Sequence, residues 1–302
     1  MKEIVNLETS ILFLKEKLQP GSFLFLDIDG TVKGPKTQEA PLGFDPELPA
    51  SLHQLQNSGV MVGACTSQSP LELSSFLEER MGDTNLFTGV NILEDGHIVV
   101  MPGENIASEC QVLASPEALQ QIEALKKILK RLWQPAGTHD LASDWWGFFP
   151  SVATPIILPE GKYQGAVTMS IWEKGPDIHD PSYQGEYEPV RTYIDSVISS
   201  LGINGIDLVE AGNGTLRIVQ KGLSKTSALE WLANQGVVEL SRSIYIGDGL
   251  NDVEPATLIK QAGGGVVAVG NAITALKEIA NYSCANLYSH GIIEVLRKVA
   301  HL

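Results

Sequence analysis

The sequence predicts an α/β protein: a core built on a mostly parallel β-sheet, with a second, α+β domain inserted into it. Continuous apolar runs such as FLFL (residues 23–26) and SIYIG (243–247) are typical of strands that are buried on both faces. These runs alternate with helical segments in the first and last parts of the chain, which is the pattern of a parallel sheet covered by helices. Between these parts lies a stretch rich in aromatic residues and proline that breaks the alternation.

The first part of the chain is expected to open with an amphipathic helix. Apolar residues recur at helical spacing from Ile4 to Leu18, and Pro20-Gly21 ends the pattern. We expect no signal peptide here, because the apolar run ILFL is short and charges flank it. The elements expected next are a strand at 23–26, a helix at about 47–57, a strand at 60–65 and a helix that follows Pro70.

The last part repeats this order, whereas the middle part departs from it. The elements expected in the last part are a strand at 216–219 (LRIV), a helix at 226–234, a strand at 243–247, a helix at 253–261 and a strand at 265–270. The middle part has one long helical stretch at 116–132 and strand candidates at 166–172 and 206–211. We therefore expect core segments at 1–104 and 216–302 and an inserted domain at 105–215.

Composition excludes several classes of function. The chain has 302 residues, and 21 Lys and Arg against 36 Asp and Glu give a net charge of −15. This balance disfavours binding to nucleic acid or to an anionic membrane surface. Three widely spaced cysteines, Cys65, Cys110 and Cys284, predict neither a disulfide framework nor a zinc site. Since no apolar stretch reaches the roughly 18–20 residues of a membrane helix, we expect a cytoplasmic protein, as a monomer or homodimer.

Polar side chains follow the expected strands at the end where open parallel sheets bind ligands. They come from four distant segments: Asp27 and Asp29; Thr66 and Ser67; Lys225; and Asp248 with Asn251 and Asp252. Any one of these clusters alone has an ordinary explanation, such as a turn or a helix cap. Together they predict one site that is assembled from all four segments.

The chemistry of that site follows from its charges. Asp27, Asp29, Asp248 and Asp252 would crowd four carboxylates together, which either raises a pKa or requires a cation. Oxygen ligands favour Mg²⁺, and Lys225 adds a second positive charge. Carboxylates can form aspartyl-phosphate intermediates, and a neighbouring carboxylate can serve as general acid and then as base. The residues therefore indicate a phosphoryl-transfer site for a small-molecule phosphate ester.

The same residues resemble a known family. DIDGT, CTS, SK at a helix start and GDGLND match in order the four motifs of the haloacid dehalogenase (HAD)-like superfamily. The insertion falls between the second and third motifs, where that superfamily carries its C2-type cap domain on a Rossmann-like core. The segments ILEDGHIV and GGGVVAVGNA are similar to the Cof-type and sugar-phosphatase branch. The likeness covers both core segments and is weak across the insertion.

The resemblance implies a role for each motif residue. Asp27 would be the nucleophile and a Mg²⁺ ligand, and Asp29 the general acid and base, with its backbone carbonyl also binding the metal. Thr66 and Lys225 would hold the transferring phosphoryl group, and Asp248 would be a further Mg²⁺ ligand. The supporting positions are Asp252 for the metal and Gly30, Thr31, Ser67 and Asn251 for phosphate.

The substrate is less well indicated than the reaction. Where many relatives read TGR, this chain reads Thr66-Ser67-Gln68, which has some likeness to mannosyl-3-phosphoglycerate and sucrose-phosphate phosphatases; Thr226 and Pro255 are further departures. We expect a Mg²⁺-dependent phosphatase that hydrolyses a small phosphomonoester, such as a phosphosugar, through an aspartyl-phosphate. A phosphomutase of the phosphomannomutase type and a catalytically inactive binding protein are the alternatives.

Two stretches of the insertion and one cysteine have competing interpretations. Trp145, Trp146, Phe148 and Phe149 would either stack on a sugar or form the core of the inserted domain. The polar run at 175–188 would be either a specificity loop or a solvent loop. Cys65 adjoins the Thr66 motif, yet its position in a strand predicts a small buried apolar residue.

Overall fold

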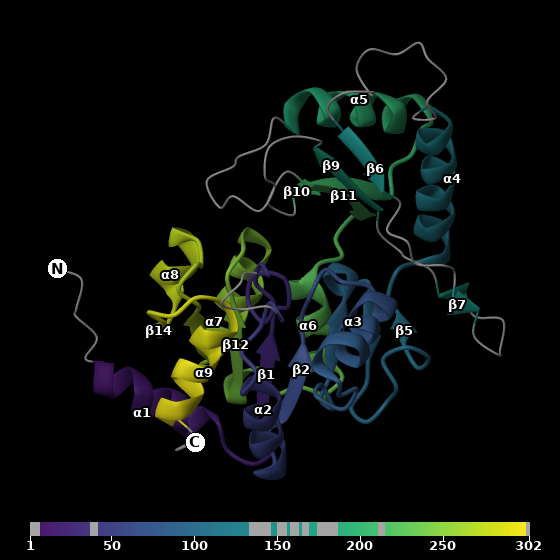
Figure 1. The fold of residues 1–302 in the computed structure, drawn as a ribbon. Coiled ribbons are helices and arrows are strands. Elements are labelled where there is room, and N and C mark those ends of the chain that lie inside the picture. Colours follow the sequence, from purple (N-terminus) through teal and green to yellow (C-terminus); the bar gives the residue numbers. More distant parts are fainter. Residues whose placement is uncertain are drawn as a thin grey trace. The chain divides into compact units, whose positions relative to one another are not determined.

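The computed structural model describes residues 7–36, 42–132, 146–149, 156–157, 163–164, 169–173, 187–210 and 215–299. The chain divides into two compact units, one made of Met1–Gln111 with Ser224–Leu302 and the other of Val112–Leu223 (Figure 1). The bounds expected from the sequence, 105 and 215, lie several residues before these. Each unit has its own sheets and its own buried apolar side chains, and each is described separately.

The core unit is built on a five-stranded parallel sheet, which confirms the predicted fold class. Its strands are β1 (Phe23–Leu26), β2 (Met61–Ala64), β12 (Ser243–Gly247), β13 (Gly265–Ala268) and β14 (Tyr282–Ser283), in the order β14-β13-β12-β1-β2. Strand β1 lies between β12 and β2, so that Phe23 is opposite Ser243 on one side and Met61 on the other. All four residues of β1 are buried, as expected for a strand covered on both faces.

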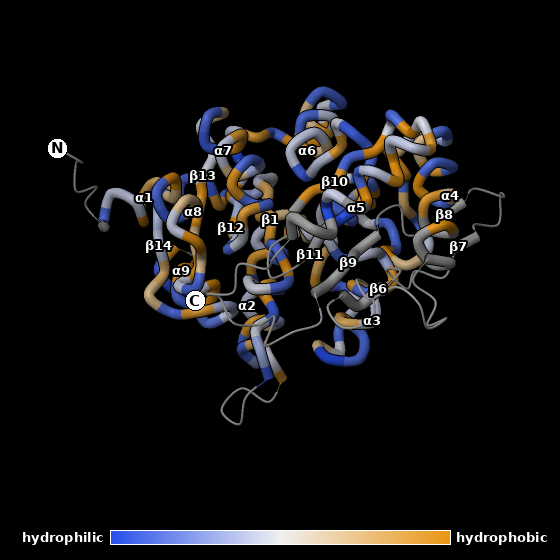
Figure 2. Tube along the Cα trace, turned by 90° about the horizontal axis from the view of Figure 1, so that it is seen from above, coloured by the Kyte–Doolittle hydropathy of each residue, from blue (hydrophilic) through white to orange (hydrophobic). Residues whose placement is uncertain are grey.

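Two groups of helices pack on this sheet. One group consists of α1 (Leu7–Lys17), α2 (Leu48–Asn57) and α9 (Tyr288–Val299), and the other of α6 (Lys225–Asn234), α7 (Val253–Gln261) and α8 (Thr274–Ile279). Figure 2 shows α6 and α7 on one side of β1 and β12, with α2 and α9 on the other. The leucines at 48, 52 and 55 give α2 a buried apolar face at helical spacing. The helical segments expected at 47–57, 226–234 and 253–261 are thus confirmed.

A small sheet adjoins the end of β2. It contains β3 (Asn91–Leu93), β4 (Ile98–Val100) and β5 (Gln111–Val112), and a bridge between Cys65 and Ile92 links it to the β2 strand. The turn between β3 and β4 is the 3₁₀ segment η2 (Glu94–Gly96), in which Glu94 and Asp95 have φ angles of 47° and 54°. Positive φ is costly for residues with a Cβ, so this turn stores backbone strain.

The remaining core elements complete the connections. Helix α3 (Pro70–Phe76) is extended by a π-helical turn, η1 (Leu77–Met81), which ends at Gly82 with a φ of 67°. The short 3₁₀ segments η3 (Leu240–Arg242) and η4 (Leu250–Asp252) lie on either side of β12. Ser69 and Glu72 form a capping box at the start of α3, which explains why the helix begins directly after the Thr66-Ser67-Gln68 segment.

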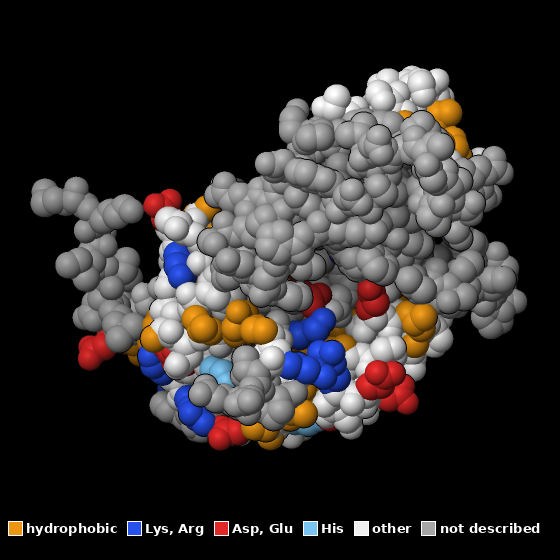
Figure 3. All heavy atoms as spheres, turned by 45° about the horizontal axis from the view of Figure 1, so that its top comes forward, with side chains coloured by type: hydrophobic (Ala, Val, Ile, Leu, Met, Phe, Trp, Pro, Cys, Tyr) orange, Lys and Arg blue, Asp and Glu red, His pale blue; other side chains and the backbone are white. Residues whose placement is uncertain are grey.

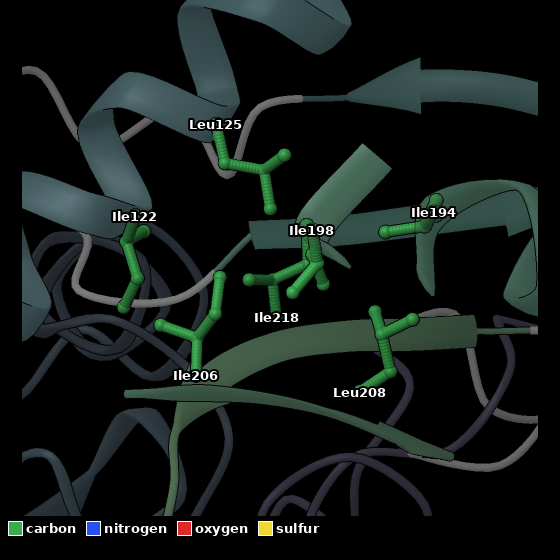
Figure 4. Close-up of a cluster of buried hydrophobic side chains, with 7 residues drawn as sticks. All are labelled: Ile122, Leu125, Ile194, Ile198, Ile206, Leu208 and Ile218. Carbon is green, nitrogen blue, oxygen red and sulfur yellow. The ribbon is translucent and has the colours of Figure 1, made fainter. Parts of the chain in front are cut away.

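The second unit contains an antiparallel sheet and two helices. Its described elements are α4 (Pro116–Leu132), β6 (Trp146–Phe149), β7 (Ile156–Ile157), β8 (Tyr163–Gln164), β9 (Met169–Glu173), α5 (Tyr187–Ser200), β10 (Ile206–Glu210) and β11 (Thr215–Gln220). The main sheet has the order β10-β11-β9-β6, and β7 pairs with β8. Figure 4 shows side chains of α4, α5, β10 and β11 that point toward one another: Ile122, Leu125, Ile194, Ile198, Ile206, Leu208 and Ile218.

The assignment of LRIV (216–219) to the parallel core sheet is wrong. This segment is a strand, but it forms part of β11, which pairs antiparallel with β10 on one side and with β9 on the other. Ile218 is fully buried in the cluster of Figure 4, so the strand contributes its apolar face to the second unit. The second core segment therefore begins at Ser224, not at residue 216.

The surface and the helices add two further observations. None of the helices in the described part of the chain is long and apolar enough to cross a membrane. On the face shown in Figure 3, the described side chains mix acidic, basic and apolar groups. The exposed apolar side chains include Leu12, Leu250 and Leu287.

Candidate active site

The parallel register brings the predicted polar residues to one edge of the core sheet. Asp27 follows β1, Thr66 follows β2 and Asp248 follows β12, and these three strands are adjacent. Asp27 continues the ladder beyond β1, because its N–H donates to the carbonyl of Ile246 at 3.0 Å. The carboxyl ends of adjacent parallel strands therefore place these residues side by side, as the sequence predicts.

Lys225 lies at the centre of the site. It is the first residue of α6, and its Nζ donates to Asp27 Oδ1 at 2.8 Å and to Asp252 Oδ1 at 2.7 Å. The side chains of Lys225 and Asp252 are 2% and 0% exposed, and that of Asp27 is 7% exposed. Ser224 caps the helix, since its hydroxyl accepts from the N–H of Ser227 at 3.2 Å. The cap fixes the start of α6, and with it the position of a buried ammonium between two buried carboxylates.

The charges of the site are unbalanced toward the negative. Burial alone would lower the pKa of Lys225, but the carboxylates of Asp252 and Asp27 outweigh it and hold this pKa well above its usual value. Burial and the charge of Asp252 raise the pKa of Asp27 well above its usual value, although Lys225 opposes this effect. Burial and the same Asp252 charge raise the pKa of Asp248 to about 7. One ammonium does not neutralise three carboxylates, so the cluster favours a further cation.

Asp252 organises the segment that carries Asp248. Its Oδ2 accepts hydrogen bonds from the N–H of Asp248 at 3.0 Å and of Gly249 at 2.9 Å. Its Oδ1 accepts from the hydroxyl of Tyr245 at 2.7 Å as well as from Lys225. Because each of its oxygens already accepts two hydrogen bonds, Asp252 fixes the turn after β12. Asp27 and Asp248, whose oxygens accept at most one hydrogen bond each from the described residues, are better placed to bind a metal directly.

Asp248 is held by groups from two other segments. Thr31 Oγ1 donates to Asp248 Oδ1 at 2.8 Å, and Asn271 Nδ2 lies 3.3 Å from Oδ2. Asn271 also donates to the carbonyl of Gly30 at 2.7 Å. Gly30 has a φ of 90°, and a Cβ at this position would lie 2.3 Å from Asp248 Oδ2. In this structure Gly30 and Thr31, predicted as phosphate contacts, are engaged in positioning the Asp248 carboxylate.

The Asp29 carboxylate lies apart from the buried cluster. Its side chain is 50% exposed, and its two oxygens accept from Lys33 Nζ and Gln68 Nε2, each at 2.7 Å. The group of carboxylates whose oxygens lie within 4.8 Å of one another consists of Asp27, Asp248 and Asp252. The role of the Asp29 backbone carbonyl as a metal ligand stays a prediction.

The second motif is anchored by backbone hydrogen bonds. Thr66 is fully buried, its N–H donates to Ile92 O at 2.8 Å, and its carbonyl accepts from Asp95 N at 3.2 Å. Its hydroxyl oxygen accepts from the N–H of Gln68 at 3.1 Å. The hydroxyl hydrogen therefore remains available for another acceptor, such as a phosphoryl oxygen. Ser67 is half-buried beside it.

Asn251 and the strained turn face each other. Asn251 Nδ2 lies 3.4 Å from Asp95 Oδ1, and Asp95 is one of the groups whose charge raises the pKa of Lys225. A Cβ at Gly96 would lie 2.0 Å from the carbonyl oxygen of Ser224, so η2 packs tightly against the start of α6. The strained turn thus supports the segments that carry Thr66 and Lys225.

Three residues of the site were given no role there from the sequence. Tyr245, Asn271 and Gln68 each donate to one of the motif carboxylates. Tyr245 is fully buried between Ile244 and Ile246, where a buried hydroxyl needs a partner, and this was a usable signal. Asn271 directly follows the GVVAVG run, at the same end of the sheet as the motif residues.

Of the other features predicted from the sequence, some can be located in the structure and some lie outside the described residues. Cys65 is fully buried, and burial raises the pKa of its thiol to about 12, which confirms the prediction of a small apolar residue. Trp145 and residues 175–186 lie outside the described part of the chain. Trp146, Phe148 and Phe149 form strand β6, but the positions of their side chains are not described.

The donor set fits a hard divalent cation. Asp27, Asp248 and Asp252 offer only carboxylate oxygens, which are the ligands that Mg²⁺ prefers. The raised pKa values of Asp27 and Asp248 have the same causes, namely burial first and then the negative charge of Asp252. A divalent cation at this position would stabilise both carboxylates in their ionised form.

Comparison with known proteins agrees with this geometry. The family model described as haloacid dehalogenase-like hydrolase matches residues 183–296, which include Lys225, Asp248 and Asp252. Over this segment the chain is similar to the haloacid dehalogenase-like hydrolases. It is 33% identical over 96 residues to a phosphoglycolate phosphatase of Methanobrevibacter smithii, covering 32% of this chain and 39% of that protein.

A second curated relative and two solved structures extend the likeness. The chain is 31% identical over 91 residues to the 5-amino-6-(5-phospho-D-ribitylamino)uracil phosphatase of Escherichia coli, covering 30% of this chain and 32% of the relative. The matched segments thus span about a third to two fifths of the curated relatives. A putative HAD/COF-like hydrolase from Plasmodium vivax has a TM-score of 0.63 at 17% identity, with 95% of this chain and 99% of that chain covered.

A HAD superfamily phosphatase structure from Bacteroides thetaiotaomicron has a TM-score of 0.56 at 15% identity, with 94% and 97% of the two chains covered. At these identities, the two structural matches show a shared fold. That fold extends over most of the chain, whereas the sequence matches are confined to shorter segments.

Proposed function

We propose that this protein is a Mg²⁺-dependent phosphatase that hydrolyses a small phosphomonoester through an aspartyl-phosphate on Asp27. The observation that supports this most directly is the buried Lys225 ammonium, which hydrogen bonds to Asp27 at 2.8 Å and to Asp252 at 2.7 Å. A carboxylate at a strand end, beside a fixed cation and a second carboxylate pair, is suited to attack a phosphoryl group. If the ion pairs of Lys225 had only a structural role, they would not require the additional negative charge of Asp248 nearby.

Asp27 has a free oxygen with which to attack. Its Oδ1 accepts from Lys225, and none of the described residues donates to Oδ2. In the first step, an Asp27 carboxylate oxygen forms a bond to phosphorus and the ester P–O bond breaks, while Asp29 gives a proton to the departing alkoxide oxygen. In the second step, water attacks phosphorus and gives its proton to Asp29, and the bond between phosphorus and Asp27 breaks.

The other residues hold the phosphoryl group and its charge. The Thr66 hydroxyl, whose oxygen already accepts from Gln68 N, would donate to a phosphoryl oxygen. Lys225 would remain protonated throughout, since the carboxylates of Asp252 and Asp27 hold its pKa high. Mg²⁺, held by Asp27 and Asp248 in the turn that Asp252 fixes, would neutralise charge on the phosphoryl oxygens.

The substrate class rests on the relatives and on the inserted unit. The two curated relatives are named as phosphatases of small phosphorylated metabolites. The proposed substrate is therefore a small polar phosphomonoester, such as a phosphosugar. Residues 112–223, which form the inserted unit, are proposed to act as a cap that selects it.

The test is phosphate release from a panel of phosphorylated metabolites, with and without Mg²⁺. The unaltered protein is expected to release inorganic phosphate only with Mg²⁺, and Asp27→Asn is expected to lose at least about a thousandfold in kcat while remaining folded. Isomerised phosphosugar in place of free phosphate would indicate a mutase. Wild-type activity in Asp27→Asn would show that the proposed nucleophile is wrong.

A further inference from the structure

Gln68 is a buried residue whose amide reaches the Asp29 carboxylate. It is 7% exposed, and its Nε2 donates to Asp29 Oδ2 at 2.7 Å. We propose that Gln68 is a positioning residue that holds the Asp29 carboxylate in the orientation needed for proton transfer to the leaving group. This inference rests on the proposed phosphatase function and gives a role to the residue that directly follows CTS.

The backbone of Gln68 is fixed on both sides. Its N–H donates to the Thr66 hydroxyl oxygen at 3.1 Å, and its carbonyl accepts from the N–H of Glu94 at 3.0 Å. Glu94 belongs to the strained turn η2, and Ser69, directly after Gln68, caps α3. The Cα of Gln68 is therefore held by two neighbouring loops and a helix start, so its side chain reaches Asp29 from a rigid support.

The Asp29 contact explains why an amide stands at this position. A carboxylate only accepts hydrogen bonds, so the NH₂ group must face Asp29. The other end of the amide, Oε1, is buried and has no partner among the described residues. A buried acceptor without a donor reduces stability, and a methionine of similar length would avoid this cost. Stability therefore disfavours glutamine here, whereas a requirement to orient Asp29 favours it.

Lys33 and Gln68 together fix the plane of the carboxylate. Lys33 Nζ donates to Asp29 Oδ1 at 2.7 Å while Gln68 holds Oδ2. The Lys33 side chain is 30% exposed and has a long flexible stem, so its hold is the weaker of the two. Each carboxylate oxygen has a second acceptor site, so the held Asp29 can still exchange a proton with a leaving group or a water.

The experiment compares two esters in Gln68→Met, in the full chain with Mg²⁺. An alkyl phosphate needs a proton on its leaving oxygen, whereas p-nitrophenyl phosphate has a leaving group that departs without one. The parameter kcat/KM is measured because it reports the first phosphoryl transfer and not the later hydrolysis of the aspartyl-phosphate. We expect a loss of about 30- to 100-fold for the alkyl ester and less than about threefold for the aryl ester.

Two matched variants separate position from polarity. Gln68→Asn keeps the amide but is one methylene shorter, so it is expected to lose as much on the alkyl ester as Gln68→Met. Lys33→Met removes the weaker hold and is expected to lose less than either. The melting temperature of Gln68→Met should equal or exceed that of the unaltered protein, because the unpartnered Oε1 is removed.

Two kinetic outcomes and one structural outcome would overturn the inference while leaving the phosphatase proposal intact. One kinetic outcome is an equal loss on both esters, which would indicate a general disturbance of the site, and the other is no loss on either. A crystal structure of Gln68→Met tests the positioning without reference to activity: the Asp29 carboxylate should be turned away or occupy several orientations. An unchanged Asp29 would refute the proposal. Absence of phosphate release by the unaltered protein from any ester would instead refute the proposed function.

Discussion

Replacing Lys225 by methionine removes a buried positive charge while nearly preserving the volume of the side chain. The lysine hydrogen bonds to Asp27 and Asp252, and all three side chains are at most 7% exposed. In the variant, two buried carboxylates would face each other without this cation, and the nearby Asp248 would add to their repulsion. We expect the free energy of unfolding of the metal-free core unit to fall substantially.

The magnitude follows from the burial of the pair. Removing one partner of a buried ion pair costs about 3–5 kcal/mol, because the remaining charge is left uncompensated in the interior. No reduction for solvent screening applies here, since Lys225 is 2% exposed. A change of 1 kcal/mol shifts the melting temperature by about 2–4 °C in a domain of this size, so we expect a decrease of about 6–20 °C.

The assay is thermal unfolding followed by circular dichroism in EDTA, with the exposed lysine variant Lys260→Met as the matched control. The control is expected to change the melting temperature by less than about 3 °C. The double variant Asp27→Asn with Lys225→Met should recover part of the loss, because it removes one of the two stranded carboxylates. A Lys225→Met melting temperature within about 2 °C of the unaltered protein would refute the reasoning that this lysine compensates buried charge.

Four further predictions concern other groups of the site. In the metal-free protein, the folded-state pKa of Asp248 is raised from 3.8 to about 7, so the free energy of unfolding should fall as the pH rises from about 4 to 7. Mg²⁺ should therefore raise the melting temperature more at pH 8 than at pH 5. An equal increase at both pH values would contradict the raised pKa. Tyr245→Phe removes a hydroxyl donor from buried Asp252 and should cost about 1.5–3 kcal/mol in urea unfolding. Gly30→Ala should weaken Mg²⁺ binding, as measured by calorimetry, because the new Cβ would lie 2.3 Å from Asp248 Oδ2. An unchanged affinity would argue against Asp248 as a ligand. Cys65, whose thiol pKa is raised to about 12, should resist iodoacetamide at pH 8 in the folded protein and react after unfolding, as measured by mass spectrometry.

The parallel core was predictable because its strands are buried on both faces. Runs such as FLFL and SIYIG have no polar alternation, which excludes a strand with one face in water. The LRIV segment was assigned to the wrong sheet because four residues are too few to reveal alternation. The wider segment TLRIVQ alternates from Thr215 to Ile218, since polar Arg217 lies between Leu216 and Ile218, and such alternation is typical of the antiparallel sheet that β11 joins; Val219 ends the pattern.

Several residues of the site could be predicted because their order along the chain identified them. The motif positions of Asp27, Lys225, Asp248 and Asp252 follow from their places after strands or at a helix start. The contacts of each side chain could not be predicted from the sequence, because hydrogen bonds such as that from Thr31 to Asp248 join segments far apart in sequence. Asp29 was expected to lie with the other carboxylates, but its hydrogen bonds from Gln68 and Lys33 depend on side-chain directions that sequence spacing does not encode.

The position of β1 between β2 and β12 has a consequence for how the protein is made. Phe23 and its partner Met61 are synthesised within the same short stretch of chain, but its other partner, Ser243, is synthesised only after the whole inserted unit. Until then, one edge of β1 is unpaired, and such an edge can associate with other chains. Closing so long a loop is also slow. Asp27 has no Lys225 beside it during this interval, so the nascent chain carries the proposed nucleophile without the cation that the proposed catalysis requires.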